Sequence, residues 1–146
     1  MAPDAQHALV FHAPQEPIAG DSDAEALIRA KPGYSVLDLE SGFSRLISSD
    51  IEVDDFTFWF NGEDSFAFVS FVDENTRISA VERIELSSAL IERLNLSSPV
   101  SHLGRLAGRQ RVWVNQDHPL GRMTFVDVFS GQPKTITGFE LNRRIQ

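Results

Sequence analysis

One stretch predicts local structure more strongly than any other part of the chain: residues 56–72, with the sequence FTFWFNGEDSFAFVSFV. Aromatic and β-branched residues lie on both sides of Asn61-Gly62, and both of these turn residues tolerate a positive φ angle. The pattern therefore predicts a β-hairpin. Side chains alternate across a strand, so Phe58 and Trp59 face opposite sides and both faces of the hairpin are apolar. We expect these two strands to lie centrally in a sheet, with a covering layer on each face.

Further strands are predicted on both sides of this hairpin. Apolar residues and turn signals predict strands over 109–115, 122–130 and 135–141. Residues 96–108, which contain Ser, Pro and Gly, are expected to form a loop. Near the start of the chain, residues 9–11 have the composition of a short edge strand.

Helices are predicted in two places. Residues 22–31 follow the order of a capping box and end before Pro32-Gly33, and one further helical turn is expected near 43–47. The main helix is predicted over 79–95, which begins with a second capping box and continues with apolar residues at helical spacing. A competing interpretation is a strand over 78–86 followed by a shorter helix that begins at Ser87.

Together these elements predict an α+β fold. We expect a mostly antiparallel sheet of about five strands, with the main helix packed on one face and a short N-terminal helix. The chain has 146 residues, the size of one ordinary domain. We therefore expect residues 1–20 to be a flexible or loosely docked segment and residues 21–146 to form a single α+β domain.

The chain contains no cysteine, which excludes disulfides, thiolate metal sites and a catalytic thiol.

The net charge of −8 is distributed unevenly along the chain. Residues 1–73 hold 14 acidic and 3 basic residues, a net charge of −11, whereas residues 74–146 hold 7 acidic and 10 basic residues, a net charge of +3. An acidic molecule is a poor nucleic-acid binder, because binding to phosphate needs a basic surface. The charge instead favours a cationic protein partner, since opposite charge accelerates association. The alternative is that the acidic surface only keeps the protein soluble.

The N-terminal sequence predicts the compartment. It has no basic residue before Arg29 and no apolar run long enough to cross a bilayer. We therefore expect a cytoplasmic protein that does not act on a membrane.

The best enzymatic candidate is the connection between two predicted strands. Asp117 precedes His118, and Arg122 follows closely, so the carboxylate would orient the imidazole while the arginine holds an anionic substrate. The alternative is a turn with polar decoration. No glycine-rich phosphate loop and no zinc-ligand spacing occurs, and we expect neither a metal nor a cofactor.

Acidic residues form the first candidate for partner binding. Asp50, Glu52 and Asp54 alternate with apolar residues and would form a line of carboxylates on one strand face, here called the acidic ridge. Glu63 and Asp64 would extend this ridge. The alternative is an ordinary solvated strand face.

A second candidate for partner binding lies on the strand predicted over 109–115. Arg109, Arg111 and Trp113 share one face of it, and arginine and tryptophan are enriched among the residues that dominate binding energy at interfaces. The alternative is that the arginine stems cover the tryptophan within one molecule.

These observations favour a non-enzymatic protein-binding module over other functions. Small acidic proteins of this type include bacterial toxin-neutralising (immunity) proteins and secretion chaperones, which would bind a cationic protein. One alternative is a small enzyme or ligand-binding domain with a pocket near His118. Another is a structural or assembly component that uses exposed strand edges.

Overall fold

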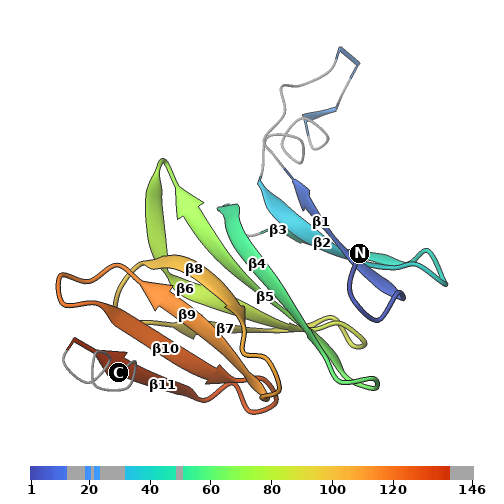
Figure 1. Cartoon of the computed structure of the whole chain (residues 1–146). Coiled ribbons are helices and arrows are strands. Elements are labelled where there is room, and N and C mark those ends of the chain that lie inside the picture. The colour runs from blue at the N-terminus through green and yellow to red at the C-terminus, as the bar shows by residue number, and fades with distance from the viewer. Residues whose placement is uncertain (13–18, 21, 24–31, 49–50, 139–146) are drawn as a thin grey trace. The chain divides into compact units, whose positions relative to one another are not determined.

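The structure is a computed structural model. Every regular element in the part that it describes is a strand, and the strands form three antiparallel sheets (Figure 1). The chain divides into two compact units, Met1–Val53 and Asp54–Gln146. The described residues are 1–12, 19–20, 22–23, 32–48 and 51–138.

The first unit contains a three-stranded sheet in the order β1-β2-β3. Its β1 confirms the edge strand expected over 9–11, and Tyr34 and Val36 of β2 are buried. The bounds are β1 (His7–His12), β2 (Gly33–Asp38) and β3 (Ser44–Ser48).

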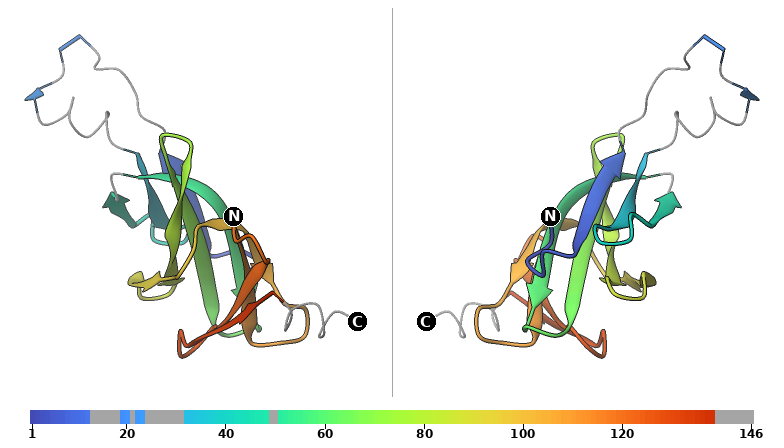
Figure 2. Two further views of the ribbon diagram at one scale, coloured as in Figure 1. Left: turned by 90° about the vertical axis from the view of Figure 1, so that its left-hand side faces the viewer. Right: turned by 90° about the vertical axis from the view of Figure 1, so that its right-hand side faces the viewer.

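The second unit contains two four-stranded sheets, in the orders β4-β5-β6-β7 and β11-β10-β9-β8. Consecutive strands pair with each other within each sheet, and Figure 2 shows the twist of the long strands β4 and β5 (green). The strands are β4 (Glu52–Phe60), β5 (Ser65–Asp73), β6 (Thr76–Glu85), β7 (Leu90–Asn95), β8 (Val100–Arg105), β9 (Arg111–Gln116), β10 (Arg122–Asp127) and β11 (Pro133–Thr137).

The hairpin predicted around Asn61-Gly62 is confirmed as β4 and β5. The Asn61 side-chain oxygen accepts hydrogen bonds from the backbone N–H groups of Glu63 at 2.9 Å and Asp64 at 2.7 Å. Gly62 has a φ angle of +100°, which a residue with a side chain rarely adopts. Asparagine and glycine thus close the loop for two different reasons, the first by hydrogen bonding and the second by conformational freedom.

One apolar core joins the inner faces of the two sheets. Trp59, Phe66 and Phe68 contribute from β4 and β5, and they are almost completely buried. The other face of β5 is also buried, since Ala67 and Val69 have no exposed surface. The prediction that both faces of this strand are covered is therefore confirmed. The opposite sheet contributes mainly valines to this core: Val112, Val114, Val126 and Val128.

The predicted α+β class is wrong, because the described residues form an all-β structure. The main helix expected over 79–95 is the pair of strands β6 and β7, joined by a turn in which Ala89 has a φ angle of +57°. Both Val81 and Ile84, which face opposite sides of β6, are completely buried. Because β6 is buried on both faces, it lacks the polar–apolar alternation that identifies a strand. The apolar residues at helical spacing, Leu90, Ile91 and Leu94, lie on β7, which is largely exposed, and their spacing is a coincidence.

Other expectations meet mixed outcomes. The competing interpretation of a strand over 78–86 is confirmed by β6, but the helix that it placed from Ser87 onward is wrong. The expected loop at 96–108 contains β8, and the helical turn expected near 43–47 overlaps β3. Most of the helix predicted over 22–31 lies outside the described residues. The strands expected over 109–115, 122–130 and 135–141 are confirmed as β9, β10 and β11, with bounds that differ by one to four residues at most of their ends.

The division into a segment 1–20 and one domain 21–146 stays a prediction.

Across the described part of the chain, no helix combines the length and the apolar character that a membrane span requires.

Polar side chains tie the two sheets of the second unit together at their ends. Arg83 of β6 donates hydrogen bonds to the backbone carbonyls of Val128 at 2.6 Å and Phe129 at 2.5 Å, beyond the end of β10. Its guanidinium carbon also lies 5.0 Å from the centre of the Phe66 ring, a cation–π distance. The indole N–H of Trp59 donates to the carbonyl of Arg109 at 2.9 Å.

We expect Arg83→Met to destabilise the protein by about 2–4 kcal/mol, because it removes charge-assisted hydrogen bonds and leaves the partly buried carbonyl of Val128 without its partner. Urea unfolding at neutral pH measures the change. Arg93→Met is the matched control, since Arg93 is an exposed arginine of β7 and its replacement should cost no more than about 0.5 kcal/mol. Equal losses for the two variants would show that Arg83 does not tie the sheets together.

Candidate functional site

The structure gives Asp117, His118 and Arg122 separate partners. Asp117 is exposed and lies 3.5 Å from the guanidinium of Arg77, and the Nδ1 atom of His118 accepts a hydrogen bond from the backbone N–H of Leu120 at 3.1 Å. Arg122 donates to hydroxyl groups, among them that of Thr137 at 2.9 Å. The three side chains are therefore not directed at one point. The connection is a turn that carries polar side chains, as the alternative interpretation expects.

The acidic ridge is interrupted in the described residues. Glu52 and Asp54 are exposed on β4, but the Asp54 carboxylate lies 3.8 Å from the Nε atom of Arg77, which also pairs with Asp117. Asp50 lies outside the described residues. Glu63 and Asp64 occupy the loop at the far end of β4, about 20 Å from Asp54 at the rise of an extended strand. The structure therefore does not bring the four described acids together as one surface.

Arg111 and Trp113 do share the outward face of β9, as expected from the alternation. Two cross-strand pairs place Asp127 beside Arg111 and Phe125 beside Trp113 on that face. On the other side of β9, Trp113 is paired with Gly104 of β8. Arg109 precedes the strand, in the β8–β9 hairpin.

The indole ring of Trp113 lies directly over Gly104. A Cβ atom on Gly104 would approach the ring carbon Cζ2 to 2.5 Å, a distance that real Cβ atoms essentially never show. Covering a glycine with an aromatic ring from the neighbouring strand is a known way to stabilise a sheet edge. Here it also lays the ring along the sheet surface.

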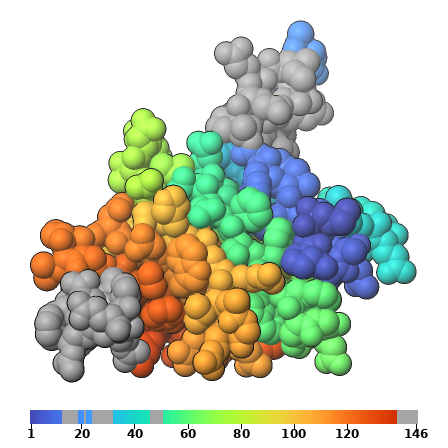
Figure 3. Space-filling model, viewed as in Figure 1, coloured from blue at the N-terminus to red at the C-terminus, as the bar shows by residue number. Residues whose placement is uncertain are grey.

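An apolar hollow surrounds Trp113 on this outward face, with a volume of about 480 Å³. In Figure 3 the atoms of β9 and β10, in orange, are on the side turned to the viewer. We call this hollow the Trp113 groove. Its lining residues are His102, Leu106, Trp113, Asn115, Met123 and Phe125.

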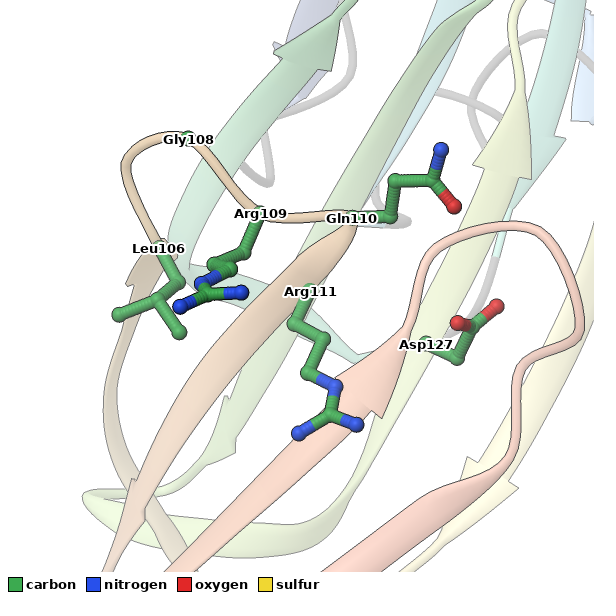
Figure 4. A pocket seen from close by; sticks show the side chains of 6 residues that line it. All are labelled: Leu106, Gly108, Arg109, Gln110, Arg111 and Asp127. Carbon is green, nitrogen blue, oxygen red and sulfur yellow. The ribbon is translucent and has the colours of Figure 1, made fainter.

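A second hollow of about 680 Å³ adjoins the groove, since Leu106 lines both. Figure 4 shows that Arg109 and Arg111 project to the same side of the hairpin, whereas Gln110 projects to the other. We call it the arginine hollow. Its lining residues are Leu106, Gly108, Arg109, Gln110, Arg111 and Asp127.

The one carboxylate that lines the arginine hollow, that of Asp127, already accepts hydrogen bonds from the backbone of its own turn. Oδ1 of Asp127 accepts hydrogen bonds from the backbone N–H groups of Ser130 at 2.8 Å and Phe129 at 3.1 Å. The hydrogen bond from Ser130 is the main cause that lowers the pKa of Asp127 below its ordinary value, and the charge of Arg111 adds to it. Asp127 therefore stays ionised and directed towards the β10–β11 turn at neutral pH.

Sequence reasoning missed most residues of this surface, among them Gly104, Leu106, Met123 and Phe125. A usable signal was present in the strand predicted over 122–130. Met123 and Phe125 alternate there with Thr124 and Val126, so the strand is largely apolar on both faces. In a sheet at the surface of a domain, the outward apolar residues have no core to enter.

Comparisons with known proteins identify no family for this chain. No protein-family model matches the sequence, and no curated protein matches it as a relative.

We expect Gly104→Ala to destabilise the protein by about 1–3 kcal/mol, because the added methyl group collides with the Trp113 ring. Urea unfolding gives the free energies. The same substitution in a Trp113→Ala background should cost much less, since the colliding ring is gone. Equal costs in the two backgrounds would contradict the contact.

Asp127 should make stability depend on pH in acid. Its pKa is lower in the folded than in the unfolded protein, so ionisation stabilises the fold above the ordinary value of 3.8. This stabilisation is lost as the pH falls from 3.8 through the lower pKa of the folded state. We expect the difference in unfolding free energy between wild type and Asp127→Asn to be constant above about pH 5 and to shrink below pH 4. A difference that persists unchanged to pH 2 would refute this.

Proposed function

We propose that this chain is a protein-binding module whose binding surface is the outward face of β8, β9 and β10. The Trp113 groove carries the proposal. An antiparallel sheet at a protein surface ordinarily presents polar side chains to water. An apolar hollow with polar residues at its border is instead typical of an interaction surface.

The composition of the groove fits an interface with a protein. Trp113 supplies a large rigid ring, while Met123 and Leu106 supply flexible apolar surface beside it. Tryptophan and arginine are enriched at energetic centres of interfaces, and Arg111 lies two residues before Trp113 on the same strand face. The groove therefore offers an apolar anchor point next to a cationic border.

The shape of the groove favours an extended protein segment over a small molecule. Small-molecule sites enclose most of their ligand in a concave cavity. The lining of the Trp113 groove comes from one face of a single sheet and the hairpin at its end, so it is accessible along its length. We infer that a partner segment lies along β9 and inserts an apolar side chain beside Trp113.

The proposed function agrees with the sequence-based expectation only in its broad class, a protein-binding module. A role as an immunity protein or as a secretion chaperone stays a prediction, as does a cationic partner for the acidic residues. The observations that support binding concern the Trp113 groove and not the acidic ridge.

A random peptide library displayed on phage, selected against the full chain, tests the proposal. We expect recurring peptides with an aromatic or large aliphatic residue, and micromolar dissociation constants by fluorescence anisotropy. Met123→Lys places a charge in the groove and should weaken binding at least tenfold, about 1.4 kcal/mol, as should Trp113→Ala.

Leu90→Lys is the matched control, because it also replaces a surface apolar residue with lysine, but on β7 of the other sheet. It should leave peptide binding unchanged. Circular dichroism and urea unfolding establish that each variant is folded. A selection that enriches no peptide, or peptides whose affinity neither groove variant changes, would refute the proposed surface.

A further inference from the structure

We propose that the arginine hollow binds a carboxylate of the same partner segment, so that the protein recognises an acidic sequence next to an apolar anchor. The inference rests on the proposed function for the position of the segment. It adds the chemical class of the partner.

The first argument is that some arginines of the second unit have hydrogen-bond or ion-pair partners within the protein and others do not. Arg83, Arg122 and Arg77 are committed to carbonyl, hydroxyl and carboxylate groups of the protein itself. The guanidinium groups of Arg109 and Arg111 are exposed, and neither makes an ion pair or a side-chain hydrogen bond with any described residue. These two groups are therefore available to an external anion, although Asp127 lies beside Arg111 on the neighbouring strand.

The second argument is the local charge. Residues 93–116 contain four arginines and no acidic residue, although the whole chain has a net charge of −8. The carboxylate of Asp127 offsets the positive charge of the arginine hollow only in part, because the hollow is lined by two arginines and one carboxylate. A hollow of this sign favours a carboxylate, which accepts paired hydrogen bonds from a guanidinium group.

The third argument is the distance between the two hollows. Trp113 and Arg111 are two residues apart on one strand face, a separation of about 7 Å, and Arg109 lies one step further along the hairpin. An extended partner segment has the same repeat. Its acidic residues should therefore lie two to four positions from the apolar residue that enters the Trp113 groove.

A protein carboxylate fits this surface better than a nucleic-acid phosphate. Binding to a nucleic acid needs a row of basic groups that tracks successive phosphates, with an affinity that grows with their number. The outward face of β8–β10 holds two cationic side chains at one end of an apolar groove, and the chain as a whole is acidic. One or two carboxylates match this arrangement.

The test uses the peptides selected on the full chain. For each peptide, every Asp and Glu within four residues of the apolar anchor is replaced with Asn or Gln. We expect the acidic peptides to bind at least tenfold more tightly than their amide versions at 0.15 M salt. Replacing both arginines (Arg109→Gln with Arg111→Gln) should abolish this difference, whereas Arg93→Gln, an exposed arginine of β7, should preserve it.

Each outcome separates the inference from the proposed function. If groove variants abolish binding but the acidic and amide peptides bind equally, the groove stands and the carboxylate site is refuted. If neither groove variants nor the double arginine variant changes affinity, both proposals fail. Selected peptides that lack acidic residues near the anchor also refute the carboxylate site. A 15-nucleotide single strand that displaces the peptides at a lower concentration than the acidic peptides themselves would replace the protein ligand with a nucleic acid.

Discussion

The second unit depends on burying the aromatic side chains of β4 and β5 against the valines of the opposite sheet. Trp59, Phe66 and Phe68 supply the large apolar area that is removed from water, which is the main favourable contribution to folding. Valines from β9 and β10 fill the facing layer. The outward surface of β9 is the reverse side of the strand that supplies Val112 and Val114 to this contact.

Apolar packing has little directionality, so it does not by itself fix how the two sheets are placed against each other. Polar contacts at the ends of the sheets provide this directionality. Arg83 reaches two carbonyl groups of the β10–β11 connection, and Trp59 reaches the carbonyl of Arg109 in the β8–β9 hairpin. A buried or half-buried carbonyl without a partner is costly, so these bonds favour one placement of the sheets over others. The hairpin that bears the arginine hollow is thereby held to the core by its backbone, which leaves the Arg109 side chain available.

The same alternation that builds the core creates the candidate site. Val112 and Val114 point inward from β9, so Arg111 and Trp113 must point outward. Gly104 then allows the indole ring to lie along the sheet, and the register beside β10 adds Phe125. The apolar groove and its cationic border are therefore two consecutive parts of one strand face, and this order sets the chemistry that a partner segment must present.

The sequence by itself determined the local features that short-range physics controls. The Asn61-Gly62 hairpin, its two apolar faces and the shared face of Arg111 and Trp113 follow from turn chemistry and from the twofold repeat of a strand. Only the tertiary structure decided that residues 79–95 form two strands. Burial on both faces removed the strand pattern of β6, and the apolar residues of the largely exposed β7 have helical spacing by chance. Tertiary structure also decided the site. Strand register and packing place Gly104, Trp113 and Phe125 side by side and give Asp117, His118 and Arg122 separate partners, and neither property is encoded in the spacing of residues along the chain.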